Sequence, residues 1–315
     1  MTTKKTQTSE VSAHSGRENQ PVSVTDLGPT SRSSHTDRET RVVVAAAGST
    51  SDGGGHRVIE NQSEGAPSLG PILADPTLYV LASMVDDLEQ VRKAADNRIR
   101  QLTRCEADED GEVRGHCLPD DHPVVIKLRK TFDEVVTAES SSVKALEYAM
   151  KNHPLGVWVK NQNGLGMKTI ARLLSSVGDP YWNTLYDRPR TVSELWAYCG
   201  LAVHGGKAQK RAKGEKANWS AEAKMRVWNC VQPIIKNAKS PYRAVYDAAK
   251  AHLDGAVYDE HYAGRKFKGK PIEVGQPLSK GHIDARAQRV VMKAILKDLW
   301  IESKRIHEEI ESNNV

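Results

Sequence analysis

Apolar residues recur with a helical period along two long stretches of the chain. The first runs from Pro76 to Arg104 and the second from about His122 to Asn152. Spacings of four, three and seven positions separate the apolar residues of the first stretch, which are Leu81, Val85, Leu88, Ala95, Ile99 and Leu102. A heptad pattern of this kind is typical of helices that pack along one seam. We predict a long antiparallel coiled-coil hairpin over residues 76–152, and the length of the seam leaves a homodimer open.

The segment before this hairpin has no such period. Residues 1–75 contain no Phe, Tyr or Trp, and Ser and Thr take 20 of the 75 positions. A segment of this composition buries too little apolar surface to offset the conformational entropy that folding removes. We therefore predict that residues 1–75 are disordered and dispensable for folding.

A third pattern follows the hairpin, where two glycines separate two apolar helical runs. Leu155 to Val159 predicts a short helix after Pro154, and the run from Leu165 to Leu174 predicts a second one. Gly164 and Gly166 lie between them. The sequence therefore predicts helix, tight turn and helix.

This turn carries the first candidate chemistry. Glycine permits a positive φ and a close approach of the backbone to another surface. The first N–H groups of a helix have no partner within it, so together with the helix dipole they favour an anion. Lys168 and Thr169 follow at once. The pattern resembles the helix-hairpin-helix motif, which holds DNA backbone without reading bases. The alternative is an ordinary turn whose glycines only permit close packing.

The distribution of charge supports an anionic partner. The whole chain has a net charge of +5, but residues 200–300 hold 20 Lys and Arg against 9 Asp and Glu. A concentrated basic region is typical of polyanion binding. The most basic segment is a loop with Glu215 as its one acidic residue, and its cations are Lys207, Lys210, Arg211, Lys213 and Lys216. We interpret this loop as a nucleic-acid-binding arm; the alternative is a solvated loop.

The rest of the chain also has helical signals. Thr191 with Glu194 forms a capping box, Ser220 precedes a further helical run, and Pro241 begins another. Residues 254–280 read as an exposed loop and residues 285–306 as a closing helix. We predict an all-α protein in which residues 153–306 form a compact helical domain around the helix-hairpin-helix.

Other classes of protein fit less well. No apolar run approaches the roughly 18 residues of a membrane helix, and the N-terminus lacks a signal-peptide core. The four cysteines are widely spaced, which favours a reducing compartment without disulfides. Four residues between the hairpin helices are potential zinc ligands, but their spacing fits no zinc site well: Cys105, His116, Cys117 and His122. We therefore expect a cytoplasmic protein without metal or cofactor.

The order of these parts carries a family resemblance. The hairpin precedes Gly164-Leu165-Gly166, then Val177-Gly178-Asp179, and then an apolar and aromatic run that ends in Gly200-Leu201. A basic loop and a terminal helix follow. Over about residues 76–301, this order resembles the C-terminal half of the insertion-sequence transposases that are guided by a bridge RNA. The resemblance implies binding of DNA, and of structured RNA, by a protein of a bacterial or phage mobile element.

Two features of that family have no counterpart in this sequence. Its members carry an N-terminal RuvC-like nuclease domain, whereas residues 1–75 show no strand pattern for one. They also place a nucleophilic serine in the basic loop, and the matching position here is Ala208, whose methyl group cannot attack a phosphodiester. We therefore expect a DNA-binding protein related to a transposase or recombinase but without catalytic residues. The alternatives are a recombinase component completed by a partner, and a structured-RNA-binding protein.

Overall fold

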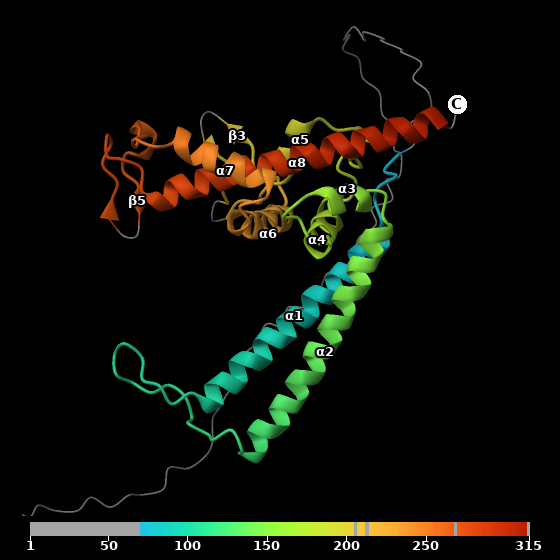
Figure 1. Ribbon diagram of the computed structural model, residues 1–315. Helices are drawn as coiled ribbons and strands as arrows, with labels where there is room; N and C mark the ends of the chain where they lie inside the picture. Colours follow the sequence, from blue (N-terminus) through green and yellow to red (C-terminus); the bar gives the residue numbers. More distant parts are fainter. Residues whose placement is uncertain (1–69, 205–206, 212–213, 268–269, 314–315) are drawn as a thin grey trace, which may run out of the picture. The chain divides into compact units, whose positions relative to one another are not determined.

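The structure is a computed structural model that describes residues 70–204, 207–211, 214–267 and 270–313 (Figure 1). These residues belong to one compact unit, residues 63–315. They are mostly helical, which confirms the predicted fold class at that level. Three antiparallel pairs of two-residue strands were not predicted. Because each pair is so short, the apolar alternation that signals a strand has no room to develop.

Two long helices come first. Helix α1 spans Pro76–Thr103 and α2 spans Pro123–Asn152, and each has proline in its first turn, where the missing N–H costs nothing. They pack side by side and antiparallel (Figure 1). Arg92 takes a heptad position of α1 that the pattern would fill with an apolar residue, and its Nε lies 2.5 Å from Oε2 of Glu139 on α2. The helical pair is thus observed, whereas its supercoiling stays a prediction.

The loop between α1 and α2 corrects the interpretation of the cysteines. Cys105 and Cys117 are joined by a disulfide. The expectation of a chain without disulfides is therefore wrong at this pair. The sequence could not show it, because the pairing depends on how the chain returns past the end of α1, where the N–H of His116 donates to the carbonyl of Gln101. Cys199 and Cys230 are free thiols in the core.

Seven further helical segments follow. They are α3 (Gly156–Asn161), α4 (Met167–Val177), α5 (Val192–Tyr198), α6 (Ala221–Lys236), α7 (Pro241–His252), the 3₁₀ segment η1 (Glu260–Tyr262) and α8 (Lys280–Asn313). The strand pairs are β1 (Trp182–Asn183) with β2 (Arg188–Pro189), β3 (Val203–His204) with β4 (Lys207–Ala208), and β5 (Lys266–Phe267) with β6 (Lys270–Pro271). Helix α8 therefore extends beyond both ends of the predicted 285–306.

Side chains at the helix starts explain where several of these elements begin. The predicted capping box is confirmed, since the Thr191 hydroxyl accepts from the N–H of Glu194 and the Glu194 carboxylate accepts from the N–H of Thr191. The Ser220 hydroxyl accepts from the N–H of Ala223 at the start of α6. Such caps satisfy amides that the helix itself leaves unpaired, and each stabilises by about 1 kcal/mol.

One apolar core connects the elements. Its buried side chains run from Leu73 to Ile306. Helix α4 contacts α1, α2 and α6, while α8 contacts α5, α6 and α7. The Trp196 indole of α5 donates to the carbonyl of Lys293 on α8 at 3.1 Å, so this aromatic ring belongs to the packing between helices. Buried residues continue across residue 152, and the predicted domain boundary there stays a prediction.

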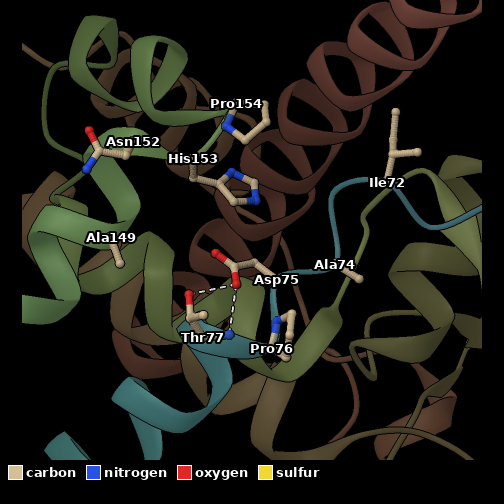
Figure 2. A pocket seen from close by; sticks show the side chains of 9 residues that line it. All are labelled: Ile72, Ala74, Asp75, Pro76, Thr77, Ala149, Asn152, His153 and Pro154. Atoms are coloured by element: carbon tan, nitrogen blue, oxygen red, sulfur yellow. Dashed lines mark hydrogen bonds between the residues drawn. The ribbon is translucent and has the colours of Figure 1, made fainter.

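Residues 70–75 correct the prediction for the N-terminal segment. Leu73 is 2% exposed. Its N–H donates to Oδ2 of Asp179 at 3.0 Å, and its carbonyl lies 3.1 Å from Nε2 of His153. Asp75 then caps α1 by accepting from both the N–H and the hydroxyl of Thr77 (Figure 2). The end of the segment is therefore part of the folded unit. The remainder of the predicted disordered segment, residues 1–69, lies outside the described residues.

Residues 70–75 form an N-terminal anchor, and His153 makes the stability of this anchor depend on pH. Its Nδ1 accepts from the N–H of Leu155 at 3.1 Å, so Nε2 carries the proton that it shares with the Leu73 carbonyl, and the ring is neutral. Burial lowers the pKa of His153, and the opposing influences of the Leu73 carbonyl, Asp75 and Asp179 do not restore it. In the unfolded chain His153 therefore takes up a proton near pH 6.5, whereas in the folded protein it takes up the proton only at lower pH.

We accordingly expect the folded protein to lose stability as pH falls below about 6.5, because the unfolded state binds more protons there. Urea unfolding at a series of pH values measures this. In His153→Asn, which keeps an acceptor near Nδ1 but does not titrate, the dependence should be weaker. An equal pH dependence in both proteins would contradict the assignment of a neutral His153.

Candidate nucleic-acid interface

The turn between α3 and α4 is held from behind by the connection between α6 and α7. The Asn237 amide donates to the side-chain oxygen of Asn163 at 2.9 Å. Gly164 has a φ of +100°, and a Cβ there would lie 3.0 Å from Oγ of Ser240 and 3.4 Å from the Ile234 side chain. This glycine is therefore required by its backbone conformation and by packing within the protein.

Gly166 has a different environment. Its φ is −95°, which any residue adopts, and a Cβ would meet only Oγ1 of Thr169 at 3.6 Å. Gly166 is exposed and provides no side-chain cap for α4. Its carbonyl accepts from the N–H groups of Thr169 and Ile170. Within the described part of the chain, the N–H groups of Gly166, Met167 and Lys168 have no acceptor. The start of α4 is thus an open set of donors.

A cavity of about 270 Å³ lies beside this helix start. Lys168 and Thr169 line it together with residues that the sequence analysis did not select: Glu89, Arg172, Arg226, Asn229 and Pro233. Lys168 forms no ion pair with any described residue, so its charge is available to a ligand. The arginines were missed because they lie on three-dimensional neighbours, α4 and α6, without a motif in sequence.

The two arginines of this cavity share one carboxylate. Asp86 of α1 pairs with both Arg172 and Arg226. Arg172 also lies 3.0 Å from Oε2 of Glu89, and Arg226 lies 3.6 Å from Oε1 of Glu222. The Nε atoms of both arginines are buried without an acceptor among the described residues. The cluster therefore joins α1, α4 and α6 beside the cavity.

The predicted basic arm is described only in part. Lys207 lies in β4, while Lys210, Arg211 and Lys216 are exposed. Lys213 lies outside the described residues. The Gln209 carbonyl accepts from the Lys224 ammonium at 3.4 Å, which ties the loop to the first half of α6.

The turn and the arm line different cavities. Lys168 faces the cavity beside α4, whereas Lys210 lines another one between the β3–β4 hairpin and α8. A third cavity, about 420 Å³ in volume, lies beside the N-terminal anchor; it is lined by Asp75 and the neutral His153 but by no lysine or arginine (Figure 2). The two basic cavities are therefore the candidate sites for an anion.

Two other classes of feature are absent from the described residues. No described helix combines the length and apolar character that crossing a membrane requires. Among the described residues, no three His, Cys, Asp or Glu side chains are grouped so that they could share a metal ion. No protein-family model matches the chain, and comparison with curated proteins and with solved structures gives no match.

Proposed function

We propose that this protein binds DNA through its phosphate backbone, with α3, the turn at Gly164 and α4 acting as a helix-hairpin-helix. The observation that carries the proposal is the open start of α4. Three N–H donors that have no acceptor among the described residues lie next to Lys168, which forms no ion pair with them, and beside a cavity with two arginines. Donors and charge thus converge on one place that a phosphate could occupy.

The physical chemistry of a helix start supports an anion there. Unpaired amides and the helix dipole together favour negative charge, and hydrogen bonds to a charged group stabilise by about 1.5–3 kcal/mol each. A side chain with a carboxylate or hydroxyl at the first position would satisfy these amides internally. Gly166 has none, so the donors remain available. Thr169 lies within the same turn and can add a hydroxyl donor to a phosphate oxygen.

The two glycines then have separate roles. Gly164 shapes the turn, because its positive φ and its contact with Ser240 exclude a side chain. Gly166 leaves the amides uncovered, because its backbone and its surroundings would accept one. The packing interpretation therefore fits Gly164, and the phosphate interpretation fits Gly166.

The wider proposal follows the resemblance described above. The protein would be related to a transposase or recombinase of a mobile element and would hold DNA without catalysis of its own. The basic loop, with Lys207, Lys210, Arg211, Lys213 and Lys216, would supply further phosphate contacts. The α1–α2 pair would act as a coiled coil, and it would also provide the surface for a homodimer.

We expect Gly166→Asp to separate binding from stability. An aspartate at this position caps the helix, so the unfolding midpoint should stay the same or rise. Its carboxylate occupies the amides and repels phosphate, so affinity for a blunt DNA duplex should fall by about tenfold or more. Fluorescence anisotropy with a labelled duplex and thermal unfolding measure the two effects. An ordinary packing turn would instead leave duplex binding unchanged in Gly166→Asp.

Lys168→Gln tests the charge in the same place. Each phosphate that a protein neutralises contributes about −0.9 to the slope of log K against log salt concentration on duplex DNA, so this variant should flatten the slope by about one. Lys144→Gln removes one charge from an exposed position of α2 and is the matched control. A structured RNA hairpin serves as a second probe, and tighter binding to it than to the duplex would favour the RNA-binding alternative.

A further inference from the structure

A second basic cavity lies between the β3–β4 hairpin, the segment around η1 and the first turns of α8. Its volume is about 430 Å³. The side chains that line it are mainly basic and aromatic: Val203, Ala208, Lys210, Asp259, His261, Tyr262, Arg265, His282, Ala285, Arg286 and Arg289. Four of these residues are permanent cations and one is an acid. Its size is within the range of ligand sites, which is about 300–1,000 Å³.

No carboxylate of the described residues neutralises these four cations. Arg286 donates to the Tyr262 hydroxyl at 3.0 Å, and Arg289 donates to the Leu201 carbonyl at 3.3 Å. Arg265 lies 3.1 Å from Nε2 of His261. The cavity's carboxylate, Asp259, accepts instead from the N–H of His261 at the start of η1. The three half-buried arginines have neutral partners, and together with the exposed Lys210 they produce a positive potential inside the cavity.

Neighbouring groups respond to that potential. Burial lowers the pKa of His282, and the charges of Arg286 and Lys210 lower it further. Burial likewise lowers the pKa of Lys224 and of Lys293, and the charge of Arg289 lowers both further. These residues come from α6 and α8, so like charges meet here from several elements. An anion would relieve the repulsion.

We propose that this cavity binds one nucleotide that lies outside the double helix, with its phosphate on Arg286 and Arg289. The base would lie among Tyr262, His282 and the Arg265 guanidinium. Flat aromatic and guanidinium groups are the surfaces on which unpaired bases stack in proteins. The Arg265 and Arg286 guanidinium carbons already lie 5.5 and 5.8 Å from the centre of the Tyr262 ring. This inference rests on the proposed function, because the nucleotide would belong to the DNA that α4 holds.

The volume and the charge of the cavity favour an unpaired nucleotide over a bare phosphate and over the backbone of an intact duplex. A bare phosphate would fill only a small part of 430 Å³ and would bring no flat surface to the aromatic side chains. The backbone of an intact duplex would offer phosphates to this cavity, but its bases are paired and stacked inside the helix. An unpaired nucleotide provides both the anion and the flat base, whether at a strand end or extruded from a duplex.

The test compares DNA probes that differ in unpaired nucleotides. We expect the full-length protein to bind a duplex with a short single-stranded overhang about tenfold more tightly than the same duplex with blunt ends, as one charge-assisted phosphate contact allows. Arg286→Gln should remove most of this preference and leave blunt-duplex affinity within about twofold. Lys297→Gln removes one charge from an exposed position of the same helix, outside the cavity, and should keep the preference.

Two further measurements separate the failure of this proposal from that of the proposed function. Gly166→Asp should weaken binding to both probes equally and keep the preference for the overhang. Deoxyadenosine monophosphate at millimolar concentration should raise the unfolding midpoint of the wild-type protein and not that of Arg286→Gln. Arg286→Lys keeps the charge and should retain part of the preference, so it serves as a second variant if the glutamine protein unfolds.

Several results would overturn the proposal. Equal affinity of the wild-type protein for both probes, together with no effect of the mononucleotide, would show that the cavity takes no nucleotide while leaving duplex binding at α4 untouched. If Arg286→Gln and Lys297→Gln lost the preference for the overhang equally, the preference would depend on net charge and not on the cavity. If the mononucleotide raised the unfolding midpoint but the protein bound no DNA, the cavity would be a site for a free nucleotide. That result would overturn both the proposal that the nucleotide belongs to a DNA strand and the proposed function.

Discussion

Asp86→Ala is expected to lower the free energy of unfolding by about 3 kcal/mol, because it leaves a buried cation without its partner. Asp86 pairs with Arg172 and with Arg226, whose side chain is 4% exposed. Without Asp86, the nearest carboxylate to Arg226 is Glu222, 3.6 Å away and half exposed. Arg172 keeps Glu89 at 3.0 Å. The loss should therefore come mainly from Arg226.

A double-mutant cycle tests this cause directly. Arg226→Met replaces the buried cation by an apolar side chain of similar length, and in the Asp86→Ala background it should restore much of the lost stability. Urea unfolding of the four proteins gives the coupling free energy, provided that the urea dependence stays the same. Lys93→Ala, which breaks the exposed ion pair with Glu89, is the control and should change stability by less than about 1 kcal/mol. Additive effects of Asp86→Ala and Arg226→Met would show that the pair does not hold α1 to α6.

The N-terminal anchor should give the second large effect. We expect a chain that begins at residue 76 to be less stable than one that begins at residue 70 by about 3–5 kcal/mol. The shorter chain loses the buried Leu73, the hydrogen bond from its N–H to Asp179, and the Asp75 cap of α1. It also leaves His153 without the acceptor that its Nε2 uses.

The loss of stability should be large because Leu73 covers the buried carboxylate of Asp179. This carboxylate is 1% exposed and also accepts from Nε2 of His307 at 2.7 Å and from the N–H of Tyr181 at 2.9 Å. Removing Leu73 would open that buried pair to water from one side. Leu73→Ala keeps the backbone hydrogen bonds and should cost about 2–5 kcal/mol through the lost side chain alone.

Thermal and urea unfolding of the full-length protein, the chain from residue 70 and the chain from residue 76 measure the contribution of the anchor to stability. The chain from residue 70 is the matched control, and it should resemble the full-length protein because residues 1–69 contain no aromatic residue and no periodic apolar pattern. If the chains from residues 70 and 76 unfold together, the contacts of Leu73 do not contribute to stability, and the original boundary at residue 75 would be the better one.

Part of this protein is determined by local sequence alone. Helical apolar spacing located α1 and α2, and proline, Ser220 and Thr191 located helix starts. Both signals are local, because helical periodicity and capping depend on residues within one or two turns. The glycine turn and the open helix start at Gly166 were also predicted. Residues 70–75 were missed, because the apolar run Ile72-Leu73-Ala74 is too short to show a period.

The tertiary structure decided the features that depend on distant pairs. Asp86 lies far in sequence from Arg172 and Arg226, and only the packing of three helices joins them. The second basic cavity combines Lys210, Tyr262 and Arg286 from separate elements in the same way. Sequence placed Gly164 and Gly166 in one motif, but their surroundings assigned one to packing and left the other open. Local patterns fix where helices form, whereas the charges and cavities between them depend on which surfaces meet.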